Sequence, residues 1–273
     1  MIIDFIHWNV NPEIFSLPDD IWLIGGLTIR WYGLLFAAPF FFGYYIMRSI
    51  FKKEGVDEKI LEKLTIYMAV GTILGARIGH CLFYQPEYYL KHPLEILLIW
   101  KGGLASHGAA LGILLTAFIF ARIHQRTFYW VIDKIVIIVA LSGLFIRTGN
   151  LINSEIVGTV TNKPWGFIFV REIPYLGNEP RHPAQAYEAI SYFIIFVVLY
   201  YLYVKKDAAN KPGLLFSIFL ISIFTMRFLI EFVKNVQVDF ESTMPLNMGQ
   251  ILSIPFVLLG IFLLIMTLKK KSV

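Results

Sequence analysis

Seven long apolar segments constrain the fold of this chain more than any other feature. They lie at approximately 27–49, 64–84, 104–122, 131–148, 188–204, 213–233 and 248–268. Each approaches the roughly 20 apolar residues that a helix needs to cross a bilayer. Backbone polar groups in lipid must be paired within the spanning segment. The pattern therefore predicts an all-α polytopic membrane protein with about seven transmembrane helices, forming a single membrane-embedded domain over residues 1–273.

The composition agrees with a membrane protein and excludes several other classes. Of the 273 residues, 57% are hydrophobic and 16% are charged, whereas about a quarter of the residues in soluble domains are charged. A single cysteine, Cys81, excludes a disulfide framework and a zinc site built on several thiolates. The N-terminal stretch MIIDFIHWNV carries an acidic but no basic residue, which is not typical of a cleavable signal peptide.

The distribution of basic residues predicts the orientation of the chain. If the seven segments are threaded in order, the connections on one side hold 13 lysines and arginines, and those on the other side hold 6. Cytoplasmic loops are enriched in basic residues, so we expect the N-terminus outside and the C-terminus in the cytoplasm. The same asymmetry explains the net charge of +5 without a nucleic-acid partner.

Two connections are too long for simple turns. Residues 85–103 mix aromatic and charged side chains, and we expect them to lie along the outer interface as an amphipathic or re-entrant piece. Residues 149–187 are polar, and the alternation within NKPWGFIFVREIPYLGNEPRHP predicts short strands. We expect this second connection, between spans four and five, to form a small external head.

Ionisable residues within the spans or at their edges are candidate functional residues. Their positions along each span all fall in the half of the membrane expected to face outside: Arg30, Arg77, His107, Arg147 and Arg227. A single arginine near a helix end commonly extends to the headgroups, which we expect for Arg30. Arg227 and Glu231 are one helical turn apart and could neutralise each other.

Small residues mark one face of the second span. Gly71, Gly75 and Gly79 form a ridge that is suited to close helix packing. Arg77 points almost opposite to this ridge and therefore requires a polar cavity of its own. His107 lies beside glycines in SHGAALG, where a histidine is more often a packed polar residue than a base.

The convergence of arginines, a histidine and carboxylates at one level favours a phospholipid site. The planar guanidinium group of arginine binds phosphate through two hydrogen bonds and keeps its charge. Two arginines can hold a phosphodiester and stabilise the charge that develops on a departing phosphate. A neutral histidine can accept a proton from a hydroxyl or thiol group. We therefore predict an enzyme that acts on a phospholipid headgroup from the outer leaflet.

The stretch RTGNLINSEIVG at 147–158 resembles the signature of the bacterial prolipoprotein diacylglyceryl transferases. Other blocks are similar to that family in the same order: IRWYGLLF (29–36), GARIGHCLFY (75–84), GGLASHGAALG (102–112), RHPAQAYEA (181–189), RFLIEF (227–232) and MGQILSIP (248–255). The resemblance covers nearly the whole chain, and ordered blocks are more specific than any one motif.

The resemblance implies a seven-helix bacterial inner-membrane enzyme with a small periplasmic head. Such an enzyme transfers the diacylglyceryl group of phosphatidylglycerol to the lipobox cysteine of a prolipoprotein signal peptide, forming a thioether and releasing glycerol phosphate. Neither a catalytic metal nor a cofactor is expected, because the sequence has no close-spaced set of metal-ligating side chains.

The family motifs also imply roles for individual residues. Arg147 would bind the lipid phosphate, His107 is the candidate catalytic base for the thiol, and Arg227 is the candidate stabiliser of the leaving phosphate. Further candidate substrate-binding residues are Tyr32, Arg77, Asn150, Asn153, Glu155, Gly158 and Glu231. Two positions depart from the family pattern. Ala109 stands where a second glycine is common, and Ile223 stands where some members have a tyrosine.

Three other classes of protein remain alternatives: a lipid transporter or flippase, an intramembrane protease, and a non-catalytic phospholipid-binding protein. The sequence shows neither the related halves typical of many transporters nor a protease motif such as HExxH or GxSxG. His107 distinguishes the transferase from a lipid-binding protein, since binding alone needs no base.

Overall fold

The computed structural model describes residues 5–16, 28–99, 102–206, 208–235, 241 and 244–269. The start of the first expected span at residue 27, residues 100–101 of the expected interfacial segment, and Lys270 and Lys271 lie outside the described residues. The chain forms two compact units, unit 1 (Met1–Phe41 and Val136–Val273) and unit 2 (Phe42–Ile135). The single domain expected over residues 1–273 stays a prediction.

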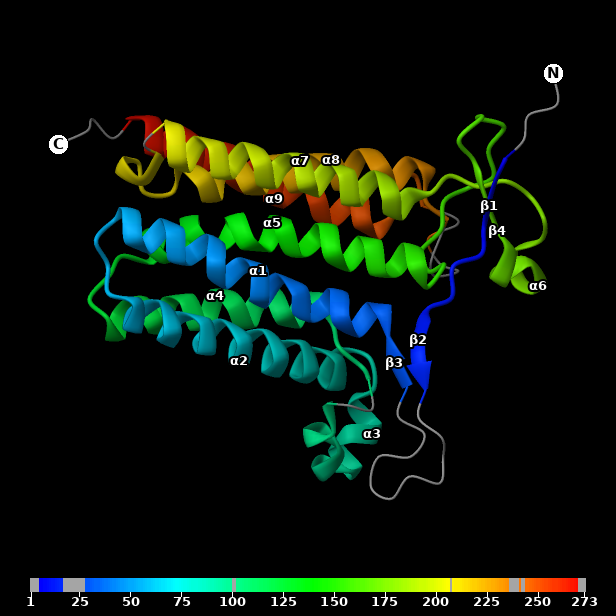
Figure 1. The fold of residues 1–273 in the computed structure, drawn as a ribbon, viewed down its shortest axis with the longest axis horizontal. Coiled ribbons are helices and arrows are strands. Elements are labelled where there is room, and N and C mark those ends of the chain that lie inside the picture. Colours follow the sequence, from blue (N-terminus) through cyan, green and yellow to red (C-terminus); the bar gives the residue numbers. More distant parts are fainter. Residues whose placement is uncertain are drawn as a thin grey trace. The chain divides into compact units, whose positions relative to one another are not determined.

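Helices that are long and apolar enough to cross a membrane dominate the described chain, which confirms the predicted fold class (Figure 1). Seven such helices are present: α1 (Trp31–Lys53), α2 (Glu58–Phe83), α4 (Ser106–Ile123), α5 (Phe128–Ile152), α7 (Ala184–Lys205), α8 (Leu214–Ile230, continued by the 3₁₀ turn η5, Glu231–Val233) and α9 (Met248–Lys269). The largest difference from the predicted spans is in α2, which begins at residue 58 rather than 64. Its charged first turns are helical because the Asp57 side chain accepts a hydrogen bond from the backbone N–H of Lys59 and caps the helix.

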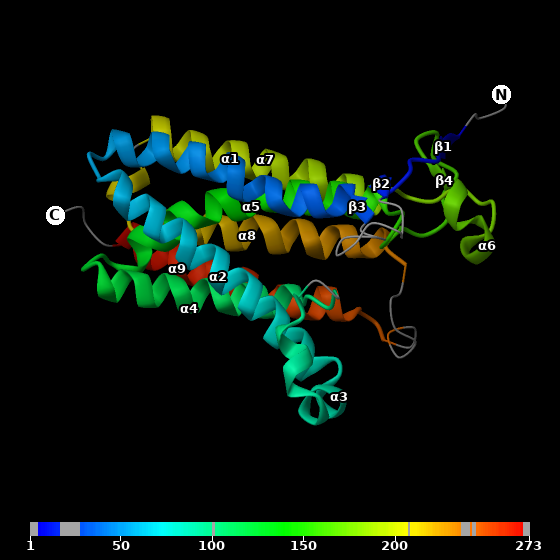
Figure 2. The same cartoon turned by 60° about the horizontal axis from the view of Figure 1, so that its bottom comes forward.

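Unit 2 is built on a close contact between α2 and α4, which lie side by side in Figure 2. The glycines of α2 face Gly108 and Gly112 of α4, and a Cβ atom at Gly75 would lie 2.4 Å from the carbonyl oxygen of Gly108. Backbones can approach this closely only where side chains are absent. The predicted glycine ridge on the second span is therefore confirmed as a helix-packing surface.

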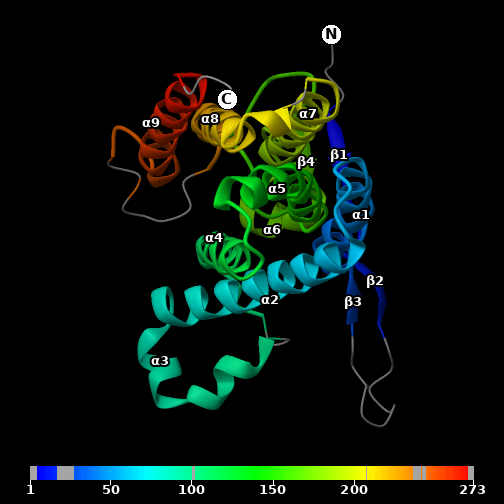
Figure 3. The same ribbon diagram turned by 90° about the vertical axis from the view of Figure 1, so that its left-hand side faces the viewer.

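The described part of the connection between α2 and α4 includes the short helices α3 (Pro86–Lys91) and η1 (Pro93–Leu97). Figure 3 shows α3 following the end of α2. Large apolar side chains are exposed in this connection, with Leu90 at 74% and Leu94 at 78% exposure. Such a surface is compatible with an interfacial segment, which stays a prediction for residues 85–103.

In unit 1, α8 lies between α7 and α9 (Figure 3). The rings of Phe224 in α8 and Phe256 in α9 stack with centroids 4.4 Å apart. A Cβ atom at Gly260 would lie 2.8 Å from the Ile221 side chain, so this glycine also permits close packing. The ends of these helices, together with the end of α5, carry the charged residues described below.

Among the described residues of unit 1, four short strands form two pairs. β1 (Ile6–Trp8) runs parallel to β4 (Phe167–Phe169), and β2 (Glu13–Ser16) is antiparallel to β3 (Thr28–Arg30). β4 lies in the connection for which the sequence predicts short strands, whereas its pairing with the N-terminal strand was not expected. The indole N–H of Trp8 donates to the carbonyl oxygen of Leu151 at 2.9 Å, which fastens β1 to the end of α5.

Candidate functional site

A buried chain of charged side chains lies at the ends of α5, α7 and α8 in unit 1. Nε of Arg147 lies 2.9 Å from Oε2 of Glu188, whose side chain has no exposed surface. Nζ of Lys234 is 3.4 Å from Oε1 of Glu188 and 2.7 Å from Oε1 of Glu231. Isolated buried charges are very costly. The alternation of cations and carboxylates is what makes this burial tolerable.

Arg227 is held less closely than Arg147. Its Nε lies 3.9 Å from Oε1 of Glu231, which is an ion pair but too long for a hydrogen bond. The side chain of Arg227 is 29% exposed, compared with 16% for Arg147. The neutralising pair that the sequence allowed is therefore weak, since Glu231 lies much nearer to Lys234.

The stretch after Arg147 extends the cluster through side-chain amides. Nη1 of Arg147 donates to Oδ1 of Asn150 at 3.1 Å, and Nδ2 of Asn150 donates to Oε2 of Glu155 at 3.0 Å. Nδ2 of Asn153 donates to the other carboxylate oxygen, Oε1 of Glu155, at 3.0 Å. The amide of Asn150 suits this position because its oxygen accepts from the Arg147 guanidinium and its N–H₂ group donates to the Glu155 carboxylate. An aspartate at 150 would place two carboxylates against each other.

The backbone of this stretch is strained where it carries Glu155. Ser154 and Ile156, on either side, have φ values of +58° and +56°. The left-handed region is uncommon for any residue with a side chain, and for a β-branched isoleucine it is an outlier. Each such residue costs about 1–3 kcal/mol and tends to occur at functional sites. These two left-handed residues turn the backbone so that the Glu155 carboxylate lies next to Asn150 and Asn153.

Gly158 allows three backbone segments to meet behind this loop. Its N–H donates to the carbonyl oxygen of His182 at 2.9 Å, and a Cβ atom would lie 2.5 Å from the carbonyl oxygens of both His182 and Val233. Gly158 also forms an antiparallel bridge with Lys234, which positions that lysine for the buried carboxylates. Burial lowers the pKa of the His182 imidazole, and the charge of Lys163 lowers it further.

Two other glycines let site side chains approach the backbone. A Cβ atom at Gly149 would lie 2.8 Å from the ring of Tyr32, and one at Gly249 would lie 2.5 Å from the carboxyl carbon of Glu231. Nδ2 of Asn247 also donates to Oε2 of Glu231 at 3.1 Å. The conformation of Glu231 is thus set by the start of α9 as well as by Lys234. Tyr32 places the start of α1 beside the Arg147 stretch.

Most residues predicted for the site therefore lie together in unit 1. These are Tyr32, Arg147, Asn150, Asn153, Glu155, Gly158, Arg227 and Glu231. Sequence reasoning missed Glu188 and Lys234, which join the two arginines. The signal for Glu188 was an acidic residue at the start of an apolar span, inside the block RHPAQAYEA. Lys234 gave no such signal, because it follows the sixth span.

Arg77 belongs to unit 2 and is occupied by the backbone there. It is 2% exposed and donates to the carbonyl oxygens of Glu95 and Gly102 at 2.6 Å and of Ile96 at 2.9 Å. Its guanidinium carbon also lies 5.0 Å from the ring centre of Tyr89. These contacts hold the connection between α2 and α4 and favour a structural role for Arg77 over substrate binding.

His107 also belongs to unit 2, in the first turn of α4, and it is exposed. The approach to this turn is fixed, because the backbone N–H of Ala105 donates to the carbonyl oxygen of Ala76 at 2.9 Å. Gly103 has a φ of +72°, and a Cβ atom there would lie 2.5 Å from the ring of His80. These contacts fix the start of the helix that carries His107, and its role as a base stays a prediction.

Arg30 lies at the end of β3, in unit 1. Its Nη2 is 3.2 Å from Oε1 of Glu13, and the two side chains are 60% and 41% exposed. An exposed pair of this kind contributes little to stability. The structure therefore gives Arg30 a surface position, in keeping with the expectation for a lone arginine.

The expectation that the ionisable residues of the spans gather in the outer half was incomplete. Asp133 and Lys134 lie near the first turns of α5, whereas Arg147 lies near its last turns. Lys134 is 2% exposed, with its Nζ 3.0 Å from Oε1 of Glu54 and 3.9 Å from the ring centre of Trp130. This second buried cluster pairs its own charges and adds a polar anchor to unit 2.

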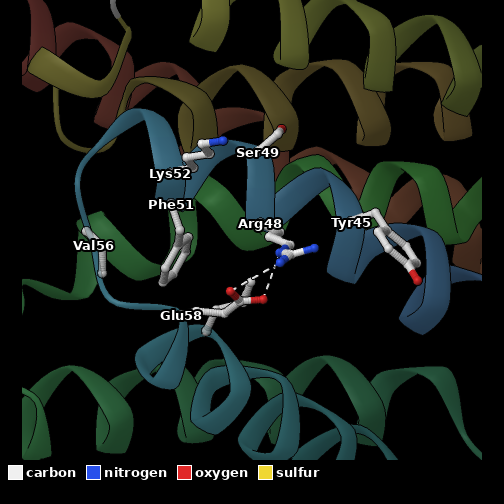
Figure 4. Close-up of a pocket in the computed structure, with 8 residues that line it drawn as sticks. Tyr45, Arg48, Ser49, Phe51, Lys52, Val56 and Glu58 are labelled. Carbon is white, nitrogen blue, oxygen red and sulfur yellow. Dashed lines mark hydrogen bonds and ion pairs between the residues drawn. The ribbon is translucent and has the colours of Figure 1, made fainter.

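A pocket of about 620 Å³ in unit 2 does not coincide with the predicted site. It lies at the end of α1 and the start of α2, and none of the predicted site residues lines it (Figure 4). Nε of Arg48 lies 2.7 Å from Oε1 of Glu58, and Nη2 lies 3.3 Å from Oε2. This arginine is already neutralised by a carboxylate in a two-point contact, which disfavours a phosphate site here.

Metal-ligating side chains do not cluster within the ranges that the structure describes. No group of three or more His, Cys, Asp or Glu residues among those ranges could hold a metal ion. Independence from metals stays a prediction.

The fold and the site together define a polytopic membrane protein whose paired arginines and carboxylates are gathered at helix ends. The sequence matches the family described as prolipoprotein diacylglyceryl transferase over residues 20–266. Three curated relatives named phosphatidylglycerol–prolipoprotein diacylglyceryl transferase are similar over nearly their full length. The relative from Tolumonas auensis is 44% identical over 98% of this chain and 99% of its own.

The other two relatives give the same result. The protein from Chloroherpeton thalassium is 45% identical over 98% of this chain and 96% of its own length. The protein from Bacteroides fragilis is 44% identical over 98% and 97%. The chain therefore belongs to the prolipoprotein diacylglyceryl transferase family, as its ordered sequence blocks indicated.

Proposed function

We propose that this enzyme transfers the diacylglyceryl group of phosphatidylglycerol to the lipobox cysteine of a prolipoprotein signal peptide. The names of the relatives support the reaction. The observation that supports different roles for Arg147 and Arg227 is that protein contacts constrain the first side chain more than the second. The Arg147 side chain is fixed by Glu188 and Asn150, whereas the guanidinium group of Arg227 makes no hydrogen bond to a described residue. An arginine held by protein partners suits ground-state binding of the phosphodiester, and one whose guanidinium N–H groups are not used within the protein can donate them to the charge that grows on the leaving phosphate.

The proposed chemistry is a displacement at the carbon of the diacylglyceryl group that is bonded to the phosphate oxygen. The thiolate sulfur attacks this carbon, the carbon–oxygen bond to the phosphate breaks, and glycerol phosphate leaves with the bonding electrons. Arg227 stabilises the leaving phosphate, and Arg147 holds it in place with Asn150 and Glu155 behind it. His107 accepts the thiol proton, which is needed because a thiol with a pKa of about 8.5 is mostly protonated at neutral pH.

The proposed setting is the inner membrane of a bacterium, with the N-terminus in the periplasm and the C-terminus in the cytoplasm. The excess of 13 basic residues over 6 between the two sets of connections supports this orientation. It places residues 149–187 in a periplasmic head and residues 85–103 at the outer interface. It also places the Arg147 cluster at the level of the outer-leaflet phosphates.

Incubation of the purified protein with phosphatidylglycerol and a lipobox peptide tests this function. We expect the peptide to gain the mass of one diacylglyceryl group and an equal amount of glycerol phosphate to be released. A peptide with serine in place of the lipobox cysteine is the control and should stay unmodified. If phosphatidylglycerol is left intact, or is consumed without modification of the peptide, the proposed function is wrong.

A further inference from the structure

Gln185 is a buried residue of the site whose side chain is only half satisfied. It lies in the first turn of α7 and has no exposed surface. Its Nε2 donates to the backbone carbonyl oxygen of Glu155, in the strained loop. Its Oε1 is buried and accepts no hydrogen bond from any described residue. An unpaired buried acceptor is costly and is uncommon in folded proteins.

The hydrogen bond to the Glu155 carbonyl oxygen identifies which atom of the Gln185 amide is unpaired. A carbonyl oxygen can only accept, so the end of Gln185 that faces Glu155 must be the N–H₂ group. The oxygen therefore points away from this contact. It presents a hydrogen-bond acceptor, and a ligand that satisfies it must bring a donor.

The Gln185 side chain borders the contacts that hold Arg147. Glu188 is three residues after Gln185, on the same face of α7, and it holds Nε of Arg147 at 2.9 Å. On the other side, Glu155 is joined to Arg147 through Asn150, with bonds of 3.0 and 3.1 Å. A phosphate on Arg147 thus brings the next few atoms of its headgroup to the neighbourhood of Gln185.

The charge balance of the cluster favours a neutral donor. Its three cations, Arg147, Arg227 and Lys234, are matched by three carboxylates, those of Glu155, Glu188 and Glu231, so a neutral hydroxyl keeps this balance and a further charge would disturb it. The hydroxyl of Ser154, 5% exposed in the same loop, also has no hydrogen-bond partner among the described residues. A headgroup with neutral hydroxyls close to the phosphate, such as glycerol, fits these unpaired polar atoms.

We propose that Oε1 of Gln185 accepts a hydrogen bond from a hydroxyl of the headgroup glycerol and makes Gln185 a specificity-determining residue. This inference rests on the proposed function, since it takes the phosphate of phosphatidylglycerol to lie at Arg147. Gln185 then distinguishes lipids with a hydroxylated headgroup from those without. A site built to pair with a hydroxyl discriminates strongly against an analogue that lacks it, because its own polar group is left unpaired.

The test combines a change in the protein with a change in the headgroup. Transfer to a lipobox peptide is measured with phosphatidylglycerol and with phosphatidylpropanol, whose headgroup has no hydroxyl. For the wild-type protein we expect kcat/KM to be about 10- to 100-fold higher with phosphatidylglycerol. Gln185→Leu also removes the Nε2 hydrogen bond to Glu155, which acts on both lipids alike, but it should lower kcat/KM for phosphatidylglycerol by about 10- to 100-fold more than for phosphatidylpropanol, so the preference disappears.

Gln250→Leu is the matched control. Gln250 is also a buried glutamine, 3% exposed, but its unpaired atom is the Nε2 donor, while its Oε1 accepts from the backbone of Asn247. We expect this variant to keep the wild-type preference. If Gln185→Leu lowers transfer from both lipids by the same factor, Gln185 is structural and the inference is wrong.

The wild-type measurement can refute the inference even if the Gln185 variant does not fold. Equal transfer from the two lipids by the wild-type protein would overturn the inference and leave the proposed function intact. No transfer from either lipid would overturn both.

Discussion

Replacement of Glu188 by glutamine tests whether the buried charges stabilise the site as a unit. Glu188→Gln keeps the size of the side chain but removes the negative charge that lies 2.9 Å from Arg147 and 3.4 Å from Lys234. Removal of one partner from a buried ion pair costs about 3–5 kcal/mol, since the other charge stays buried. At about 2–4 °C per kcal/mol for a chain of this size, the melting temperature should fall by about 6–20 °C.

The double variant Glu188→Gln/Lys234→Met provides the internal control. It removes one cation together with the carboxylate, so the formal balance of the cluster is restored. We expect it to be more stable than the sum of the single variants predicts, by at least about 2 kcal/mol. The assay is thermal unfolding of the purified proteins in one detergent at one heating rate, followed by tryptophan fluorescence. A single Glu188→Gln variant that melts within about 2 °C of the wild type, or strictly additive effects, would refute the reasoning.

Three further predictions concern the arginines, the base and the orientation. Arg147→Lys should lower transfer by about 100-fold or more, because lysine lacks the planar fork of N–H groups with which arginine contacts Glu188, Asn150 and a phosphate at once. Arg227→Lys should retain more activity, and equal losses of the two variants in quantitative transfer assays would contradict this difference. His107→Gln should lower the transfer rate by about 10²–10⁴-fold near pH 7. The difference from the wild-type rate should shrink towards about pH 9, because the substrate thiolate then forms without a base. A difference that does not change with pH would mean that His107 positions the substrate. A cysteine introduced at the exposed position Asn162 should react with an impermeant thiol reagent in spheroplasts, and one introduced at the exposed position Asn210 should not. The single native cysteine is buried and should not react with the reagent, and the reverse labelling pattern would overturn the orientation.

The parts of the fold that hydropathy controls were predictable from the sequence. Each span is an apolar stretch that must be helical in lipid, so its existence follows from composition. The start of α2 at residue 58 rather than 64 depends on the local cap at Asp57, which hydropathy does not detect. The glycine ridge at Gly71, Gly75 and Gly79 was predictable for the same reason, because its spacing places small residues on one helix face. The pairing of β1 with β4 was not predictable, since it joins strands of three residues that are far apart in the chain.

The site was predictable where its contacts are local. Arg147, Asn150 and Glu155 lie within one stretch, and their mutual contacts follow from helix spacing and a tight loop. Glu188 and Lys234 were missed because their role depends on pairing between helix ends that are distant in sequence. The contacts of Arg77 with the carbonyl oxygens of the next connection depend on tertiary structure in the same way.

The fate of one oxygen atom tests the central claim most directly. Phosphatidylglycerol can be prepared with a heavy-oxygen isotope at the atom that joins the diacylglyceryl carbon to phosphorus. If the thiolate attacks that carbon while Arg147 and Arg227 hold the phosphate, the carbon–oxygen bond breaks and all of the label leaves in glycerol phosphate. The modified peptide should then carry a thioether without label. Label retained in diacylglycerol or on the peptide would show cleavage of the phosphorus–oxygen bond and contradict the account.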